Sequence, residues 1–376
     1  MIEWLIKIGV VMGLILGACS YLIYVERKLA AYMQDRIGPN RVGPLGLLQP
    51  LADGLKFILK EDLIPRHADK LLFVLAPAIA ILTTMLAFAV VPFGPTSPGT
   101  DDVQFVIAPG LDIGIVFIFA VGSLAVYSII LGGWASNNKY SLLGALRSSA
   151  QVISYEIPLA SSVLGVVLMS GTLNMERMIQ YQANGGFLGW NAWTQPLAML
   201  IFMVSALAEA NRLPFDLPEA EQELIGGYHT EYSAMKFAMF FLGEYTHVIT
   251  ISFLVAVVFF GGWHFPWIAE VGSDYGGAWV VKCLVLAAKV GVMIIFIMLI
   301  RWTLPRFRFD QLMTLAWQGL VPLAFANVLL VMFVKQFDWS VWVLTVASIV
   351  LFVGAVVLNG RMLQRRIRSM PTAAAR

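Results

Sequence analysis

The chain has 376 residues, of which 59% are hydrophobic and 13% are charged, and its mean hydropathy is +0.79. This composition excludes a soluble domain, and it predicts an all-α polytopic membrane protein that forms a single membrane domain over residues 1–376. The net charge is only +2, and we expect no nucleic-acid partner. The cysteines, Cys19 and Cys283, lie far apart in apolar runs, so they predict neither a disulfide framework nor a metal site.

Nine apolar stretches are long enough, or nearly so, to cross a hydrocarbon core, which needs about 20 helical residues. The first has no basic n-region and no cleavage site, so we interpret it as a retained span and not as a signal peptide. An odd number of spans puts the two termini on opposite sides of the membrane. The stretches cover approximately 4–26, 71–91, 113–134, 149–171, 194–210, 237–260, 279–301, 314–334 and 339–359.

The basic residues are divided unequally between the two sides. Connections after the odd-numbered spans, together with the C-terminal tail, hold 20 of the 25 Lys and Arg residues, and the opposite side holds four. Lys and Arg accumulate in cytoplasmic loops of membrane proteins. We therefore expect the N-terminus outside, the C-terminus in the cytoplasm, and the long charged connections facing the cytoplasm.

The connection 27–70 contains Gly-Pro pairs that break regular structure, followed by a segment with helical periodicity. We predict a short amphipathic helix from Pro50 to Lys60, with Asp53 off its apolar face. At about 16 Å such a helix is too short to cross the membrane, so we expect it to lie along the interface. Its apolar face would consist of Leu51, Leu55, Ile58 and Leu59.

A second connection, 210–236, is unusually acidic for so apolar a chain. Together with the last residue of the preceding span, it holds five carboxylates within fifteen residues, and Arg212 lies one helical turn after the first of them. One interpretation is a solvated acidic loop. The other is a poorly solvated site whose coupled carboxylates hold or pass protons near neutral pH. The five carboxylates are Glu209, Asp216, Glu219, Glu221 and Glu223.

Several ionisable residues fall within the predicted spans themselves. A charge at mid-bilayer costs about 2.5–3.5 kcal/mol even on the mildest scale, so these residues indicate an ion or proton route, with structural ion pairs as the alternative. A single histidine in a span is more often a packing residue, and we assign His247 no catalytic role. The set comprises Glu156, Glu209, Glu244, His247 and Lys289.

Two function classes remain open on these grounds. One is a proton-coupled secondary transporter, and the other is a subunit of a larger membrane machine whose cytoplasmic connections dock a partner. A transporter often shows internal repeats, and we find none here. The chain also shows no P-loop, nucleophile triad or metal-ligand motif.

The connections carry motifs that resemble a known family. They read YVERK at 24–28, YMQDRIGPNRVGPLGLLQPLADGLK at 32–56, EANRLPFDLPEAEQEL at 209–224, then EYSAMKF, GEYTH, and RWTLPRFRFDQLM at 301–313. In this order and spacing they closely resemble the quinone-site membrane subunit of respiratory complex I, of the bacterial type, which is related to mitochondrial subunit 1. A related membrane subunit of energy-converting hydrogenases is the nearest alternative.

The resemblance implies a subunit of proton-pumping NADH:quinone oxidoreductase in the bacterial inner membrane. Such a subunit anchors the peripheral arm, contacts the quinone-site subunits of that arm and small membrane subunits, and forms the tunnel for ubiquinone or menaquinone. FMN and iron-sulfur clusters would belong to partner subunits only, with no redox centre in this chain. The motifs carry over tunnel positions to Glu26, Arg27, Arg36, Asp53, Phe237, Phe241 and Arg301. They carry over proton-coupling positions to Glu156, Glu209, Arg212, Asp216, Glu219, Glu221, Glu223, Glu231 and Glu244.

Overall fold

The computed structural model describes residues 2–95, 105–216, 225–271 and 277–369, with side chains from 5 to 357 within those ranges. Within them the chain forms helices and no β-strand, apart from one isolated bridge between Phe265 and Ala269. The expected all-α membrane fold is therefore confirmed. Among the predicted residues of the acidic connection, Glu219, Glu221 and Glu223 lie outside the described residues.

Helices occupy all nine predicted apolar stretches. Among the residues that the structure describes, seven helical segments are long and apolar enough to cross a membrane. Two shorter apolar helices in the same ranges are α8, with 14 residues, and the first part of α14. At 1.5 Å per residue α8 spans about 21 Å, less than the hydrocarbon core of about 30 Å. The long helices are α1 (Ile2–Met33), α3 (Lys70–Leu86), α4 (Gly114–Ala135), α5 (Lys139–Ser170), α10 (Ala234–Phe259), α11 (Ala278–Thr303), and α12 (Phe309–Thr314), which continues through a π-helical segment (Leu315–Leu320) into α13 (Val321–Gln336); α8 is Pro196–Glu209 and α14 is Val341–Ser369.

Two helices precede α8 that the sequence did not predict. The helix α6 (Met175–Asn184) begins after Asn174, whose side-chain oxygen accepts hydrogen bonds from the backbone N–H of Glu176 at 2.9 Å and of Arg177 at 3.3 Å. Such an N-cap satisfies donors that have no partner within the helix. The short α7 (Asn191–Thr194) then leads directly into α8.

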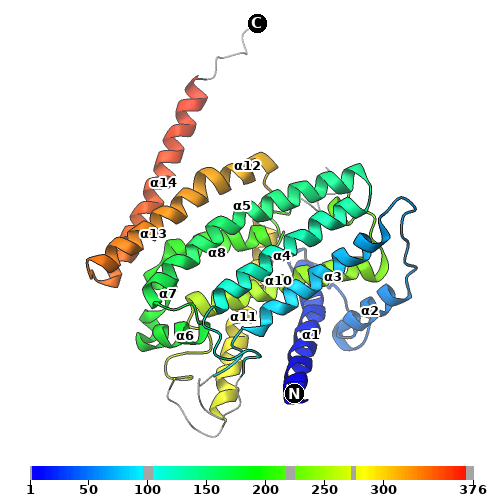
Figure 1. Cartoon of the computed structure of the whole chain (residues 1–376), viewed down its shortest axis with the longest axis horizontal. Helices are drawn as coiled ribbons and strands as arrows, with labels where there is room; N and C mark the ends of the chain where they lie inside the picture. The colour runs from blue at the N-terminus through cyan, green and yellow to red at the C-terminus, as the bar shows by residue number, and fades with distance from the viewer. Residues whose placement is uncertain (1, 96–104, 217–224, 272–276, 370–376) are drawn as a thin grey trace.

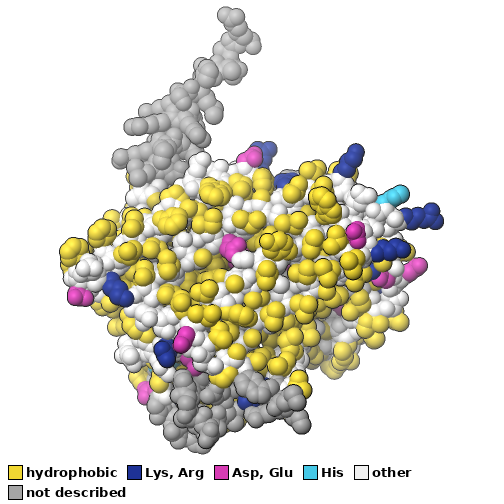
Figure 2. Space-filling model, viewed as in Figure 1, with side chains coloured by type: hydrophobic (Ala, Val, Ile, Leu, Met, Phe, Trp, Pro, Cys, Tyr) yellow, Lys and Arg dark blue, Asp and Glu magenta, His cyan; other side chains and the backbone are white. Residues whose placement is uncertain are grey.

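The helices α3, α4 and α5 run side by side, with α8 and α13 against α5 and with α10 against α3 (Figure 1). The helix α14 leads away from this body to the C-terminus (Figure 1). Figure 2 shows that hydrophobic side chains cover most of the visible face of the body, with charges concentrated near its ends. Large apolar side chains point outward, including those of Leu82 and Phe333, each 60% exposed. An exposed apolar surface of this extent fits contact with lipid.

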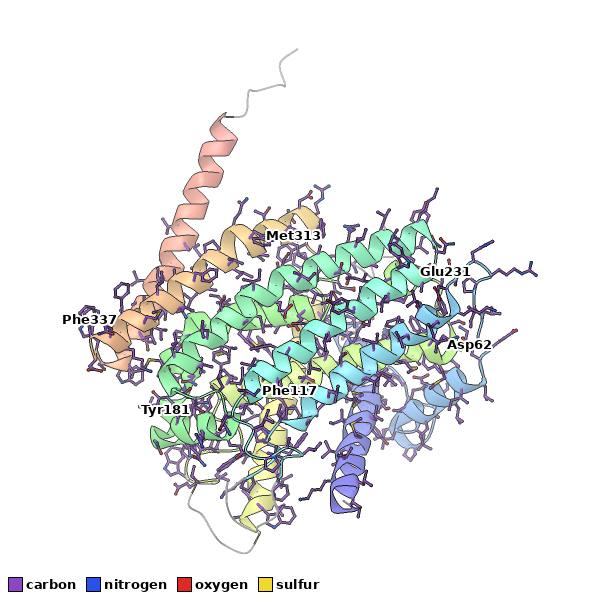
Figure 3. The ribbon with its side chains drawn as sticks, in the orientation of Figure 1. Asp62, Phe117, Tyr181, Glu231, Met313 and Phe337 are labelled. Carbon is purple, nitrogen blue, oxygen red and sulfur yellow. The ribbon has the colours of Figure 1, made fainter. Side chains whose placement is uncertain are left out.

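The polar connections after α1, α4 and α8 meet at one end of the body, where Figure 3 shows Asp62 and Glu231. The Lys236 ammonium lies 2.6 Å from the Asp62 carboxylate. The Asn138 side chain caps the start of α5 by accepting from the N–H of Tyr140, and its amide donates to Glu231 at 2.6 Å. These contacts fix connections far apart in sequence on the same side, as the nine-span topology requires.

Candidate functional site

A buried carboxylate between two guanidinium groups forms the first part of the site. Glu26, on α1, is only 7% exposed. It accepts hydrogen bonds from Arg301 on α11 and from the hydroxyl of Tyr245 on α10, and Arg212 Nη1 lies 3.7 Å from its Oε1 atom. The Arg212 guanidinium also lies 4.1 Å from the centre of the Tyr245 ring. A carboxylate out of water needs such partners, and the two arginines and Glu26 together carry a net positive charge.

A cavity of about 150 Å³ opens between α1, α10 and α2 (Gln49–Leu59). Its walls are mainly apolar, and the Asp53 carboxylate is the acidic group in its lining. Arg27 Nη1 lies 2.6 Å from Asp53 Oδ2, and the amide of Gln49 donates to Oδ1 at 3.2 Å. Residues from α1 and α2 in the wall are Ser20, Ile23, Tyr24, Gln49, Pro50, Asp53, Gly54, Phe57 and Ile58, and those from α10 are Met235, Ala238, Phe241 and Leu242.

The helix α2 turns its two faces in opposite directions. It spans Gln49–Leu59, one residue from the predicted bounds, so the amphipathic helix is confirmed. Its predicted apolar face points outward, with Leu51 64% and Leu59 82% exposed, whereas the Asp53 side chain is 18% exposed. A helix with one apolar face outward fits the membrane interface, and this orientation directs Asp53 into the cavity.

A row of aromatic rings leads from the cavity to the buried carboxylate. The ring centres of Phe57 and Phe237 are 6.3 Å apart, those of Phe237 and Phe241 are 6.1 Å apart, and those of Phe241 and Tyr245 are 4.9 Å apart. The hydroxyl of Tyr245 then donates to Glu26. The predicted wall residues Phe237 and Phe241 therefore belong to one row of aromatic side chains that begins at the cavity of Asp53 and ends at Glu26.

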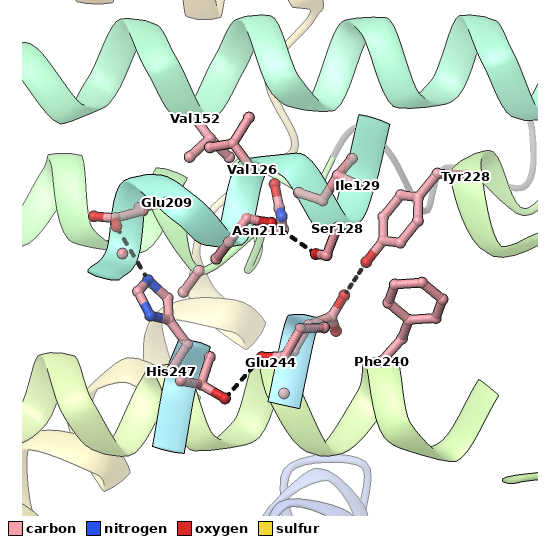
Figure 4. A pocket seen from close by; sticks show the side chains of 16 residues that line it. Val126, Ser128, Ile129, Val152, Glu209, Asn211, Tyr228, Phe240, Glu244 and His247 are labelled. Carbon is pink, nitrogen blue, oxygen red and sulfur yellow. Dashed lines mark hydrogen bonds and ion pairs between the residues drawn. The ribbon is translucent and has the colours of Figure 1, made fainter. Parts of the chain in front are cut away.

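A second group of ionisable side chains lies deeper, where α8, α10 and α4 meet (Figure 4). Glu209 Oε1 is 3.4 Å from His247 Nε2, and the Tyr228 hydroxyl donates to Glu244 Oε1 at 3.0 Å. All four residues line a cavity of about 60 Å³. Glu156 on α5 accepts a hydrogen bond from Ser123 on α4. The structure thus brings three of the predicted proton-coupling carboxylates together with a histidine.

The described part of the acidic connection is tied to its surroundings. Asp216 is 5% exposed, and Arg306 Nη2 lies 3.5 Å from its Oδ2 atom. Glu231 accepts a hydrogen bond from the Asn138 amide. Arg36, in contrast, is an exposed residue after α1 and lines none of these cavities. A solvated loop is therefore a poor description of residues 210–216, and Arg36 stays a predicted tunnel residue that these cavities do not include.

Lys289 lies apart from the carboxylates. Its ammonium donates to the backbone oxygens of Phe260, Gly262 and His264 at 2.6, 2.9 and 2.6 Å, so it holds the end of α10 and the turn that follows. Burial, and then the positive charge of Lys289, lower the pKa of His264 below its ordinary value, so this imidazole is held neutral. The intramembrane lysine therefore has a structural role.

The sequence motifs imply no role for Tyr228 and Tyr245, which complete the site. His247 is expected among the intramembrane ionisable residues, but without a catalytic role. Tyr245 and His247 belong to the GEYTH motif, and His247 lies one helical turn after Glu244, a spacing that puts both side chains on one face. This spacing is the feature of the sequence that indicates a shared site for His247 and Glu244. The contact of His247 with α8 and of Tyr245 with α1 depends on tertiary packing, which no local pattern reports.

Comparison with known proteins gives consistent results. The NADH dehydrogenase family model matches residues 6–332. The chain is 46% identical over 331 residues to the first H-type NADH-quinone oxidoreductase subunit of Cytophaga hutchinsonii, covering 88% of this chain and 96% of that protein. It is 46% identical over 330 residues to NADH-quinone oxidoreductase subunit 8 of Rhodothermus marinus (85% and 94%), and 44% identical over 313 residues to the H-type NADH-quinone oxidoreductase subunit of Protochlamydia amoebophila (83% and 91%). The matched range contains every residue of this site.

Proposed function

Because this chain belongs to the NADH dehydrogenase family, as an H-type membrane subunit of NADH-quinone oxidoreductase, we propose that it lines the path of quinone through the membrane part of complex I. Family membership makes it a multi-pass membrane subunit of an enzyme whose substrate is quinone and whose other subunits are its partners. The proposal adds that ubiquinone or menaquinone enters between α1, α2 and α10, and that FMN and the iron-sulfur clusters belong to partner subunits.

The observation that carries this proposal is the cavity with Asp53 in its wall. A quinone has a flat polar headgroup and a long apolar tail, so its path needs apolar walls and a few polar groups that orient the ring. The cavity offers Phe57, Phe241 and Met235 beside the Asp53 carboxylate. The aromatic row then leads to Glu26 and its two arginines.

Glu26, Arg212 and Arg301 would respond to the charge of the quinone. Reduction by two electrons makes the headgroup transiently anionic until it takes up protons. The net positive charge of the three residues favours an anion nearby, since electrostatic interactions are strong where water is excluded. Glu209 lies three residues before Arg212. We therefore infer that quinone reduction is coupled to the carboxylates through the segment 209–216.

The proton-coupling path would begin on this segment and continue into the membrane. It comprises Glu209, Arg212, Asp216, Glu231, Glu156 and Glu244, with Glu219, Glu221 and Glu223 in the adjoining stretch. The connections 27–70 and 210–236 would receive the peripheral-arm subunits on the cytoplasmic side of a bacterial plasma membrane, with the N-terminus outside. The positive-inside distribution supports this orientation.

Asp53→Asn tests the proposed quinone path. The amide keeps the shape of the carboxylate but removes its charge from the cavity and from Arg27. In membranes, we expect quinone reductase activity to fall about tenfold, as for a loss of about 1.4 kcal/mol in the transition state, while electron transfer from NADH to a soluble artificial acceptor is retained. Glu219→Gln combined with Glu221→Gln should give the same pattern. Unchanged quinone turnover in both variants would contradict the assignment.

A further inference from the structure

His247 contacts Glu209 in the group of buried ionisable side chains, and the proposed proton path assigns this histidine no role. Its Nε2 atom lies 3.4 Å from Glu209 Oε1, and the two side chains are only 19% and 12% exposed (Figure 4). The two residues come from different helices, α10 and the last turn of α8. Among Glu156, Glu209, Glu244 and His247, the imidazole is the side chain with two ring nitrogens, one of which can accept a proton while the other donates one.

Two cavities meet at this pair. The first, of about 60 Å³, extends toward Glu244 and Tyr228. The second, of about 20 Å³, extends between α3, α4 and α10 toward Thr83 and Thr250. Glu209 and His247 line both cavities, together with Thr84, Gly122 and Ala125. The pair therefore occupies the junction between a cavity that holds carboxylates and one that is mainly apolar.

The second cavity has few side chains, apart from Glu209 and His247, that could accept a proton. Thr83 and Thr250 donate their hydroxyl protons to backbone oxygens of their own helices, at 2.8 Å to Ile79 and 3.0 Å to Thr246. In the lining of this cavity the titratable side chains are Glu209 and His247. A side chain that takes up a proton where the two cavities meet is therefore one member of the pair.

Gly122, on α4, lies beside the Glu209 carboxylate. A Cβ atom at this position would lie 3.4 Å from Glu209 Oε1, which is ordinary contact distance. Residue 122 is therefore a direct neighbour of the Glu209 carboxylate, and as glycine it contributes no side-chain charge or hydrogen bond there.

We propose that His247 and Glu209 share one proton and that His247 is a further proton-coupling residue of this protein, an inference that rests on the proposed function. In one form His247 is an imidazolium that donates its Nε2–H to the Glu209 carboxylate. In the other the imidazole is neutral, and Nε2 accepts from the protonated carboxyl. The pair is neutral overall in the first form and in the second, so the proton changes place without any change in total charge.

The groups that face the pair set its proton affinity. From α10 itself comes Glu244, one turn earlier, hydrogen-bonded to Tyr228. From α5 comes Glu156, which lies within electrostatic range of Glu209. The linings from α3 and α4 contribute the hydroxyls of Thr83, Thr84 and Ser128 and no charge. A negative charge on Glu244, one turn from His247, would favour the imidazolium form, whereas a negative charge on Glu156 would favour the protonated Glu209 carboxyl. The position of the shared proton therefore responds to the charge of these carboxylates.

His247→Gln in the assembled enzyme tests the proposal. Glutamine can still donate to Glu209 but cannot take up a proton, so the dependence of quinone reductase turnover on pH should change. We expect the ratio of turnover at about pH 6 to that at about pH 8 to shift about threefold or more, because the substitution removes a side chain that can take up a proton. Proton translocation per electron should fall as well. The matched control is His264→Gln, a buried residue of the turn after α10 that lines none of these cavities, which should leave both measurements unchanged.

Glu209→Gln distinguishes a failure of the shared-proton proposal from a failure of the proposed proton path. If Glu209→Gln impairs turnover while His247→Gln has the wild-type pH profile and proton yield, the pair does not share a proton and this inference is wrong, whereas the proposed function stands. If Glu209→Gln and Glu244→Gln both leave turnover and proton yield unchanged, the proposed proton path fails and this inference fails with it. A shifted pH profile in His247→Gln with a normal profile in His264→Gln supports the shared proton.

Discussion

At the residue scale, the Tyr245 side chain contacts both Glu26 and Arg212. Its ring continues the aromatic row and lies beneath the Arg212 guanidinium, while its O–H donates to a carboxylate that is 7% exposed. Hydrogen bonds to charged groups stabilise proteins by about 1.5–3 kcal/mol, more than those between neutral groups. The hydroxyl therefore stabilises the charged form of Glu26 beside its two arginines.

Tyr245→Phe removes this hydroxyl and keeps the ring. We expect quinone reductase turnover to fall about tenfold, because the lost hydrogen bond is worth at least about 1.5 kcal/mol. Tyr232→Phe is the matched control: its ring is stacked on Phe73 with centres 4.0 Å apart, and its hydroxyl donates to a neutral group, the backbone oxygen of Gly132 at 3.4 Å. Steady-state assays with a short-chain quinone check both variants. Equal effects in the two would argue against a special role for Glu26.

Hydropathy predicts where helices of this chain cross the membrane, but not where they begin. The predicted span 149–171 belongs to a helix that starts at Lys139, because its first turns are polar enough to escape a hydropathy window yet are held by the Asn138 cap and by packing. The helix α6 was missed for the same reason. At the site, the motifs indicate Glu26, Arg212 and Arg301 separately. Their meeting depends on contacts between α1, α11 and the end of α8, which no local pattern encodes.

At the element scale, α5 fixes the position of the segment after α8. Gln151, on α5, is fully buried and its amide donates to the backbone oxygens of Ala208 and Phe215, both at 2.8 Å. One helical turn further, the Tyr155 hydroxyl donates to the backbone oxygen of Leu312 at 2.9 Å. The helix that carries Glu156 thus holds the segment that contains Arg212 and the helix α12, which follows Arg306.

Gln151→Leu should loosen the segment 209–216. The substitution leaves two buried carbonyl oxygens without their donor, at a cost of about 1–3 kcal/mol. We expect quinone turnover per assembled complex to fall several-fold, together with faster thermal inactivation. Gln195→Leu is the control, since Gln195 is equally buried but donates to Gly165 within the membrane body. It should affect thermal inactivation alone, and a similar loss of turnover would show that the effect is general.

At the scale of the whole molecule, the two ends of the helical body carry different segments of the chain. One end gathers the connections 27–70 and 210–236, which the Lys236–Asp62 ion pair joins. The Asn138–Glu231 hydrogen bond joins the turn between α4 and α5 to the second of them. The opposite end carries α6 and its turn, where Figure 3 shows Tyr181. The proposed orientation puts the first end in the cytoplasm beneath the peripheral arm. Residues there should be hidden by a partner, and residues at the other end should face the outside.

Single cysteines can test orientation and docking together in a Cys283→Ser background, since the remaining Cys19 is fully buried. Leu188→Cys, at a position 59% exposed next to α6, should react with a membrane-impermeant maleimide in intact cells. Glu61→Cys, at an exposed position after α2, should react only in inverted vesicles, and more strongly after the peripheral arm has been removed. The reverse pattern would invert the proposed topology. Equal labelling of Glu61→Cys with and without the arm would place the docking surface elsewhere, because a bound partner must shield the residues that it covers.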